Sequence, residues 1–408
     1  MENDADVLIV GGGLNGPALA LALAKGGLRV AVIDARPAQS RAEERFDGRA
    51  YALALASIRV LQALGLWRGL GDKAQPIRAI RASQGHAGQG PSPLFLGFDS
   101  SEIDEGAMGQ MVEDRHLYAA FLDAMRETAG VNLVSGATVV AQDAGPRGVS
   151  VTLADGRQMN GRLLVGCDGR DSAVARRAGI KRWGWDYGQT ALVCAIAHER
   201  PHDGVAHQFF MPPGPLAILP LPGNRSSIVW SERTASAEAI QRLDDAAYLE
   251  VLRPRFGDFL GDIALAGQRF AYPLRLTVAE RFVATRLALV GDAAHGVHPI
   301  AGQGLNLGLR DVAALAEVLI EAARRGEDVA ADDVLERYQE WRRFDVVRMA
   351  LGMDAVNRLF SNGNPLLGAV RGLGLGLVGA LPGLRRRFIR EAAGLQAAEP
   401  RLMQGQPI

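Results

Sequence analysis

The stretch from Val7 to Lys25 reads VLIVGGGLNGPALALALAK and predicts a buried strand, a glycine-rich turn and a helix in direct succession. Gly11, Gly13 and Gly16 form a GxGxxG motif, in which the glycines permit a tight bend, close approach of a pyrophosphate and close helix–strand packing. The start of the helix offers free N–H groups to phosphate oxygens. Asp34 ends the next strand-like run, where its carboxylate can accept from a ribose hydroxyl. These residues predict dinucleotide binding, without distinguishing FAD from NAD(P).

The composition of the chain is that of a globular protein. Its 408 residues suggest about two or three domains, and 48% are hydrophobic while 22% are charged. The 45 Lys and Arg residues balance the 45 Asp and Glu residues, which argues against nonspecific binding of nucleic acid. Cys167 and Cys194 are interpreted as buried thiols in a reducing compartment. We identify no signal peptide and no run of about 20 apolar residues, and therefore expect a cytoplasmic location.

The order of strand-like and helix-like segments predicts a mixed α/β fold. Buried-strand runs at 7–10, 163–167 and 287–290 are typical of a parallel sheet, whereas 181–272 has the alternating strands and proline-rich turns of an antiparallel one. The segment 84–101 is rich in Gly, Pro and Ser and is interpreted as a loop or crossover. We expect a Rossmann-like nucleotide-binding domain of discontinuous segments (1–75, 102–180 and 273–355), an inserted and mostly antiparallel substrate domain (76–101 and 181–272) and a helical C-terminal segment (356–408).

Two further segments distinguish between the possible nucleotides. Leu164 to Ala173 reads LVGCDGRDSA, and Leu287 to Asp311 reads LALVGDAAHGVHPIAGQGLNLGLRD; each begins in a buried-strand run. Their Asp-Gly and Gly-Asp pairs resemble the DG and GD motifs of FAD-dependent, single-component aromatic hydroxylases, and the resemblance covers the chain from about 5 to 350. It implies that the dinucleotide is FAD.

The resemblance also implies roles for individual residues. In that family the aspartate that matches Asp292 holds the ribityl chain of FAD, and the turn HPIAGQGLN wraps the isoalloxazine ring. Arginines that match Arg49 and Arg115 lie near the pyrophosphate and the ribityl chain. N–H groups at the start of the helix after this turn can stabilise negative charge on the flavin pyrimidine. The expected cofactor-binding residues are Gly11, Gly13, Gly16, Asp34, Arg49, Arg115, Asp168, Gly169, Gly291, Asp292, Gly304, Leu305 and Asn306, and the residues expected to shape the oxygen site are Pro299, Gly302, Gln303 and Gly304.

Details of the motifs resemble one branch of this family. The DG motif usually has an arginine seven residues after the aspartate, and this chain has Ala175 there. Together with FDGRA at 46–50 and GHAG at 85–88, this is similar to the ubiquinone-biosynthesis hydroxylases that act on 2-polyprenyl-6-methoxyphenol. The resemblance implies a C4a-hydroperoxyflavin, formed from reduced FAD and O₂, that hydroxylates the ring of a polyprenylated phenol. Because the chain shows no second GxGxxG motif flanked by a strand-like run and a helix of the Rossmann type, NAD(P)H is expected to bind only transiently.

Several alternatives stay open at this point. A related FAD-dependent reductase of isoprenoid double bonds, or a non-catalytic flavin-binding subunit of a lipid-biosynthesis complex, would share the same motifs. His207 and His298 are candidates for the base that deprotonates the phenol, although nothing in the sequence supports either. His295 and His298 have HxxH spacing, but no cysteine or acidic cluster accompanies them, so no metal site is expected.

The C-terminal segment predicts contact with a membrane surface. A glycine–leucine run from Pro365 to Leu384 is followed by Arg385, Arg386, Arg387 and Arg390. Apolar residues beside clustered arginines suit the interface of an anionic bilayer, and a polyprenylated phenol has to be met there. We therefore expect peripheral association with the inner membrane through this tail. Ordinary packing of the leucines, or docking of other ubiquinone-biosynthesis proteins, would use the same residues.

Overall fold

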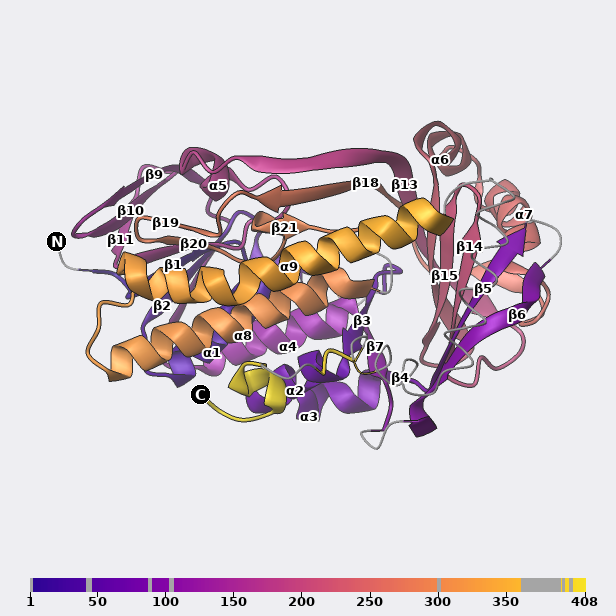
Figure 1. Ribbon diagram of the computed structural model, residues 1–408, viewed down its shortest axis with the longest axis horizontal. Coiled ribbons are helices and arrows are strands. Elements are labelled where there is room, and N and C mark those ends of the chain that lie inside the picture. Colours follow the sequence, from indigo (N-terminus) through magenta and orange to yellow (C-terminus); the bar gives the residue numbers. More distant parts are fainter. Residues whose placement is uncertain are drawn as a thin grey trace.

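The computed structural model of the chain describes residues 3–41, 46–86, 90–102, 106–298, 302–360, 390, 393–395 and 399–408. It confirms the expected mixed α/β fold. A parallel sheet with helices packed against it forms one end of the molecule, and a mostly antiparallel sheet forms the other (Figure 1).

The parallel sheet is built from short runs of Val, Leu, Ile and Ala that are buried on both faces. Such strands suit a sheet covered by helices on each side. Its strand order is β19 (Val283–Ala284), β20 (Leu287–Leu289), β12 (Leu163–Gly166), β1 (Val7–Val10), β2 (Val30–Asp34) and β8 (Val131–Ser135), and the β19–β20 pair alone is antiparallel among the described pairs. The helix α1 (Asn15–Lys25) packs against α4 (Asp114–Glu127) and against α8 (Gln303–Arg324).

The carboxyl ends of the parallel strands bring the sequence motifs to one edge. The turn 11–16 follows β1, Asp34 ends β2, the DG motif follows β12 and the GD motif follows β20. The N–H of Cys167 donates to the carbonyl oxygen of Val10 at 2.7 Å, and that of Val290 donates to Gly166 at 2.9 Å. Motifs separated by more than a hundred residues therefore share one rim of the sheet, where nucleotides bind in folds of this type.

The antiparallel sheet contains the segment that we expected to be a loop. Its strand order is β21 (His295–Gly296), β18 (Phe270–Ala279), β13 (Arg182–His198), β16 (Arg225–Arg233), β15 (Gly214–Leu221), β14 (Val205–Met211), β5 (Ala79–His86) and β6 (Gly90–Asp99), with β17 (Ile263–Leu265) on β13. The prediction of a loop or crossover over 84–101 is thus wrong for β6. Pairing with β5, as between Ser83 and Phe95, overrides the turn-forming composition of this segment. The helices α6 (Thr234–Gln241) and α7 (Asp245–Phe256) cover one face.

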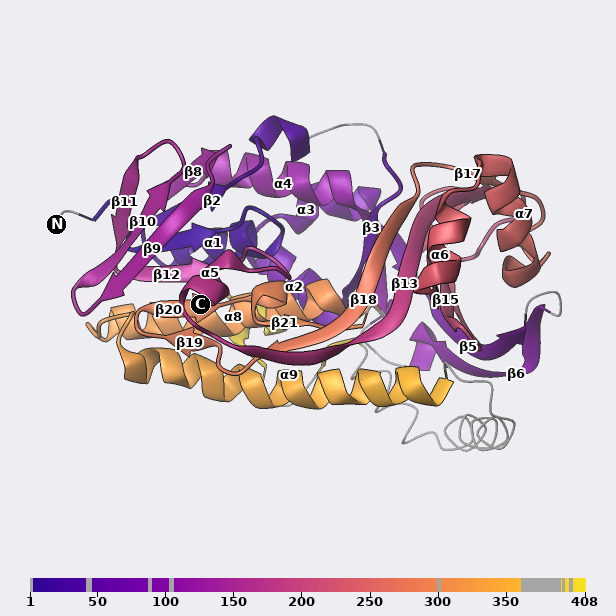
Figure 2. The ribbon, with the colours of Figure 1, turned by 90° about the horizontal axis from the view of Figure 1, so that it is seen from above.

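Two long strands connect the ends of the molecule. β13 is 17 residues long, and β18 pairs with it on both sides of a register shift between Asp186 and Gln189. Both strands curve from the parallel sheet to the antiparallel one (Figure 2). A small sheet of β3 (Ala50–Ala54), β7 (Gly109–Glu113) and β4 (Gln75–Ile77) adjoins α2 (Leu55–Ala63) and α3 (Trp67–Leu70), and a meander of β9 (Val139–Gly145), β10 (Gly148–Leu153) and β11 (Gln158–Gly161) precedes β12 and α5 (Ala173–Arg177). From this sheet membership we propose the domain boundaries stated above.

The helix α9 (Asp332–Phe360) runs along the molecule and leads into the C-terminal segment. Most of the predicted membrane-contacting tail, including Arg385, Arg386 and Arg387, lies outside the described residues. The last residues form a 3-10 turn (Arg401–Gln404), whose Leu402 and Met403 are buried against the core. Among the described helices, none has the length and apolar composition that crossing a membrane requires.

Candidate functional site

The glycine turn after β1 leaves space that fits a pyrophosphate. Gly11 has a φ of +113°, and a Cβ atom there would lie 2.2 Å from the carbonyl oxygen of Cys167. A Cβ atom on Gly16 would lie 2.0 Å from the carbonyl oxygen of Gly11, so helix and strand pack closely only with glycine. A Cβ atom on Gly13 would meet nothing within 4 Å. The open side of the turn therefore lies at Gly13, and α1 begins there without a side-chain cap on its N–H groups.

Asp34 lies where the ribose of the nucleotide is expected. Its carboxylate is 6% exposed at the end of β2 and accepts from the N–H of Arg36 at 3.2 Å. A Cβ atom on Gly12 would lie 2.4 Å from Oδ2 of Asp34, so the glycine turn passes directly over the carboxylate. A small pocket here is lined by Gly12, Asp34 and, from α4, Tyr118, Phe121 and Met125. This geometry fits the adenosine end of a dinucleotide.

The aspartate of the DG motif after β12 forms hydrogen bonds within its own loop. Oδ1 of Asp168 accepts from the hydroxyl of Ser172 at 2.5 Å, and Oδ2 accepts from the N–H groups of Ala173 and Val174 at 2.8 and 3.0 Å. The carboxylate thus satisfies the first N–H groups of α5. Gly169 has a φ of +83°, and its position is open. Asp168 consequently shapes the loop, and contact of this pair with a cofactor stays a prediction.

The GD motif after β20 packs closely against Asn15 of the glycine turn. Gly291 has a φ of +63°, and a Cβ atom there would lie 2.2 Å from Nδ2 of Asn15. A Cβ atom on Gly308 in α8 would lie 2.3 Å from the same atom. The Asn15 side chain is thus wedged between the GD loop and α8. Asp292 is 34% exposed and accepts from Nε of Arg170 at 2.9 Å, which leaves it accessible to a ribityl hydroxyl.

A buried network of hydrogen bonds and ion pairs, which sequence analysis missed, fixes the GD loop to the helices α8 and α9. Asp311 is fully buried, and its carboxylate accepts from the N–H of Gly291 at 3.0 Å and from Nε of Arg342 at 2.7 Å, and bonds Nε2 of His295 at 2.6 Å. Burial alone would raise the pKa of Asp311, but His295 and Arg342 outweigh it and hold the pKa below its ordinary value. Arg342 also donates to Asp345 at 2.7 Å. The signal available in the sequence was Asp311 itself, the last residue of the quoted GD segment.

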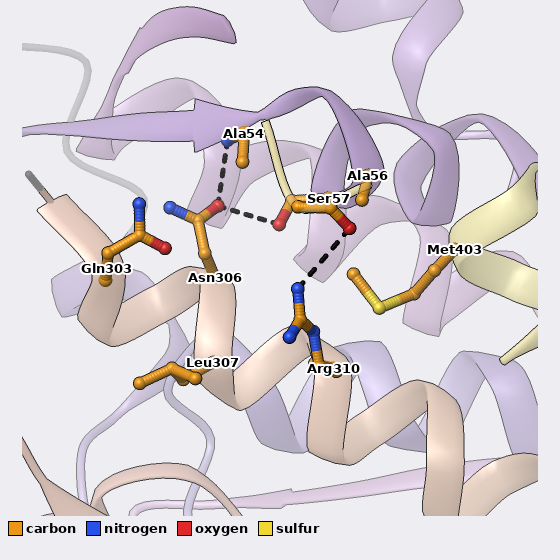
Figure 3. A pocket seen from close by; sticks show the side chains of 9 residues that line it. Ala54, Ala56, Ser57, Gln303, Asn306, Leu307, Arg310 and Met403 are labelled. Atoms are coloured by element: carbon orange, nitrogen blue, oxygen red, sulfur yellow. Dashed lines mark hydrogen bonds between the residues drawn. The ribbon is translucent and has the colours of Figure 1, made fainter. Parts of the chain in front are cut away.

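The start of α8 is fixed by Asn306. Its Oδ1 accepts from the N–H of Ala54 at 2.9 Å and the hydroxyl of Ser57 at 2.7 Å, as Figure 3 shows. Its Nδ2 donates to the carbonyl oxygens of Ala52 and Gly302 at 2.9 and 3.0 Å. All four hydrogen-bonding positions of the amide are therefore occupied, so this side chain positions the helix.

The first turn of α8 is the part of that helix open to a ligand. Gly302 precedes it in the left-handed region, with a φ of +63°, and Gln303, Gly304 and Leu305 follow with no side-chain cap. A Cβ atom on Gly304 would meet nothing within 4 Å. Free N–H groups in open space suit the pyrimidine edge of a flavin. Pro299, expected beside the oxygen site, lies outside the described residues.

The two predicted arginines are both held by carboxylates of the chain. Arg49 binds Asp47 at 2.7 Å and Asp114 at 3.1 Å. Arg115, in the first turn of α4, binds the buried Glu113 at 2.8 Å, which also accepts from Arg225 at 2.7 Å. Arg49 directly precedes β3, and Arg115 follows β7 by two residues, so both lie beside the small β3–β7–β4 sheet. Their contact with a cofactor remains a prediction.

A cavity of about 250 Å³ lies between the antiparallel sheet, the small sheet and the start of α8. Most of its lining is apolar and comes from β3–β7 and β14–β15: Ala52, Leu53, Ala54, Ile77, Ile80, Ala82, Phe98, Met108, Gly109, Ala206, Phe210 and Leu219. The polar members are His207, Gln208, Gln303 and Asn306. An apolar ring would fit here with one edge toward the first turn of α8.

Both candidate histidines pack against aromatic rings. His207 borders the cavity, but its ring lies 4.7 Å from the ring of Phe259. The His298 ring lies 5.1 Å from the ring of Tyr187 and is 1% exposed. Burial, with a smaller effect of Arg170, lowers the pKa of His298 to about 4. His295 bonds Asp311, and the described residues hold no group of three or more His, Cys, Asp or Glu side chains suited to a metal ion.

The buried His207 predicts a loss of stability in acid. Burial, and then Arg81, lowers its pKa from 6.5 to about 4. Between these values the unfolded chain binds a proton that the folded chain does not, so stability is lost as the pH falls below 6.5. We expect this histidine to contribute up to about 1.4 kcal/mol per pH unit in that window. Urea unfolding at pH 7, 6 and 5 measures this. The free energy of unfolding should fall less steeply with decreasing pH in the His207→Leu protein than in the wild type. An equally steep fall would show that His207 is not the group responsible.

Comparison with known proteins identifies the family. A family model described as "FAD binding domain" matches residues 4–351. Among characterised relatives, the ubiquinone hydroxylase UbiL of Rhodospirillum rubrum is 47% identical over 99% of this chain and 94% of that protein. The 3-demethoxyubiquinol 3-hydroxylase of Escherichia coli is 35% identical over 96% and 98%.

Solved structures agree with the fold. The p-nitrophenol 4-monooxygenase PnpA of Pseudomonas putida has a TM-score of 0.81 at 20% identity, covering 98% of this chain and all of that one. PqsL of Pseudomonas aeruginosa, solved with 2-aminobenzoylacetate, has a TM-score of 0.75 at 26% identity, covering 88% and 97%. The glycine turn, the GD loop and the first turn of α8 fit FAD. The chain therefore belongs to the FAD-dependent aromatic monooxygenases, in the branch that contains the ubiquinone hydroxylases.

Proposed function

We propose that the protein hydroxylates the aromatic ring of a polyprenylated phenol in ubiquinone biosynthesis, with O₂ and NAD(P)H as co-substrates. The observation that carries this proposal is the apolar cavity that borders the first turn of α8. A ring substituted with an isoprenoid chain is almost entirely hydrocarbon, and such a lining favours it through burial of apolar surface. The names of the two relatives support the same substrate class.

The residues around FAD would each bind or orient one part of it. The turn at Gly13 and the N–H groups of α1 would hold the pyrophosphate, Asp34 the ribose, and Asp292 the ribityl chain. When bound and reduced, FAD would supply the oxygen chemistry. Gly302, Gln303 and Gly304, together with Pro299, would line the place where O₂ reacts, and the N–H groups of this turn would stabilise negative charge on the pyrimidine. The apolar lining would keep water away from the reacting ring.

Deleting the gene in its host tests this proposal. A precursor of ubiquinone that lacks one ring hydroxyl should accumulate and be identified by mass spectrometry. The purified, yellow protein should also consume O₂ in a substrate-dependent reaction with NAD(P)H. Reduction of an isoprenoid double bond without O₂ consumption would indicate the reductase instead. Normal ubiquinone synthesis with a flavin that neither reacts with substrate nor accepts electrons would indicate a non-catalytic subunit.

We also propose that the protein acts at the surface of the inner membrane, and α9 supports this. Phe344 and Leu351 are 77% and 47% exposed, although most large apolar side chains of the described chain are buried. They lie two helical turns apart on one face, with the exposed Arg348 between them and Arg358 beyond. Arg348 also binds Asp345 at 3.3 Å, and Arg358 binds Asp354 at 2.9 Å. The residues after α9 contain the arginine-rich tail. An apolar and cationic face of this kind suits an anionic bilayer.

Substituting Phe344→Glu and Leu351→Glu together is expected to weaken binding to vesicles containing phosphatidylglycerol by at least about tenfold, because two apolar contacts are lost. Co-sedimentation measures this. Val140, which is 50% exposed on β9, provides the matched control: Val140→Glu should bind like the wild type. A chain ending at Asn364 tests the tail separately, provided that it still holds FAD, because the truncation also removes the buried Leu402 and Met403. Equal binding by all these proteins would contradict both membrane contacts.

A further inference from the structure

One wall of the cavity is formed by a single face of β14. Side chains alternate along a strand, so Ala206, Gln208 and Phe210 share the cavity face, while His207 and Phe209 face the helices α6 and α7. The apolar character of this wall is interrupted by Gln208 alone among its described side chains.

The neighbours of Gln208 leave room in front of its amide. In the sheet it pairs with Ala82 of β5 on one side and with Ala217 of β15 on the other. Directly paired residues have their Cβ atoms about 5 Å apart on the same face, and alanine has nothing beyond that atom. The glutamine side chain therefore lies between two alanines. It is the longest of these three side chains, which are paired across β5, β14 and β15.

The other polar groups around the cavity are already engaged or belong to a different wall. The amide of Asn306 has four partners in the chain, and the His207 ring packs on Phe259. Gln303 approaches from α8, on the side where the flavin is expected. Within the described part of the chain, no hydrogen bond of the Gln208 amide to a protein group is present. Its donor and acceptor are thus available to whatever fills the cavity.

We propose that Gln208 selects the substrate by hydrogen-bonding an oxygen substituent of its ring. A hydroxyl would donate to Oε1, and an ether or phenolate oxygen would accept from Nε2. The ring would then lie across the apolar wall with one edge held by Gln208 and the opposite region near the first turn of α8. This inference rests on the proposed function, because it takes a substituted ring as the ligand. It adds which residue discriminates an oxygenated ring from a purely apolar one.

The discrimination follows from the dry surroundings. A ligand without oxygen leaves the amide without a partner in an apolar cavity, which is unfavourable, whereas an oxygenated ring satisfies it. Replacing the glutamine by methionine keeps a similar length and volume but removes both polar atoms. The preference for the oxygenated ring should fall by about tenfold.

The test compares two probes that differ in one oxygen, 2-allylphenol and allylbenzene. Their binding to the FAD-loaded protein is followed by the change in flavin absorbance, without NAD(P)H. Wild-type protein should prefer 2-allylphenol, and Gln208→Met should abolish that preference by weakening the phenol and not the hydrocarbon. Leu219→Ala, on the same wall of the cavity, is the matched control and should weaken both probes equally.

Each outcome has one meaning. An unchanged preference in Gln208→Met, or equal weakening of both probes, overturns the role of Gln208 while leaving ring binding in place. If neither probe binds to the wild-type protein, the cavity is not the site of the ring and this inference fails with it. The proposed function is judged separately by the precursor that accumulates in the deletion strain.

Discussion

The Asp311→Ala protein is expected to lose about 3–5 kcal/mol of its free energy of unfolding, because the substitution removes one of the two carboxylates that bind a buried arginine. Arg342 is 2% exposed, and its Nε lies 2.7 Å from Oδ1 of Asp311. The N–H of Gly291 and the ring of His295 would lose the same acceptor. Urea denaturation in saturating FAD measures the loss. Since Gly291 begins the GD turn, the remaining folded protein should also bind FAD more weakly.

Asp328→Ala is the control for this prediction. Asp328 binds two arginines, Arg286 at 2.6 Å and Arg162 at 3.2 Å, whereas Asp311 binds one, but Asp328 is 37% exposed. Solvent screens such a pair, and its removal should lower the stability by about 1 kcal/mol or less. Similar losses of unfolding free energy in the two variants would contradict the prediction that burial makes the Asp311 contacts more stabilising than those of Asp328.

Two alanine substitutions in the glycine turn are expected to separate folding from cofactor binding. Gly16→Ala places a methyl group 2.0 Å from a backbone oxygen of Gly11, so the FAD-free protein should be destabilised by about 1–3 kcal/mol. Gly13→Ala places a methyl group in open space, and the FAD-free protein should keep its stability. That space is where the pyrophosphate is expected. Losing one hydrogen bond to a charged group there should raise the dissociation constant of FAD by roughly 10- to 150-fold.

The measurements are thermal unfolding of the FAD-free proteins and titration with FAD. Wild-type affinity in Gly13→Ala would place the pyrophosphate elsewhere. Destabilisation of FAD-free Gly13→Ala to the same degree as Gly16→Ala would contradict the difference in local space on which the prediction depends.

The fold was predictable where short segments carry their own geometry. The strand, turn and helix at 7–25 form as expected because apolar runs and glycines determine them locally. The strand β6 was not predictable in this way, since its Gly, Pro and Ser residues favour turns. Pairing with β5, whose own position depends on β14 more than a hundred residues later, makes it a strand.

In the candidate site, too, local features were predictable and contacts between distant residues were not. The spacing of the GD segment indicated which residues gather at the sheet edge, but not what their side chains bond. Asp168 caps α5, and three of the four hydrogen bonds of Asn306 join it to residues some 250 positions away, so both act through the backbone that they hold. The partner of Asp311 lies 31 residues further along the chain, on α9. Such contacts depend on how helices pack, which no local pattern encodes.

The strand order of the parallel sheet also has a consequence for biosynthesis. β1 and β2 leave the ribosome early, but β20 completes the rim only about 250 residues after β2. At roughly 5–20 residues per second, the glycine turn waits about 13–50 s for the GD loop that completes it. A nascent chain stopped before residue 287 would therefore have the first half of the nucleotide site without the second. Capture of FAD thus follows synthesis of the GD segment, and stable retention of the cofactor marks chains that have been translated beyond it.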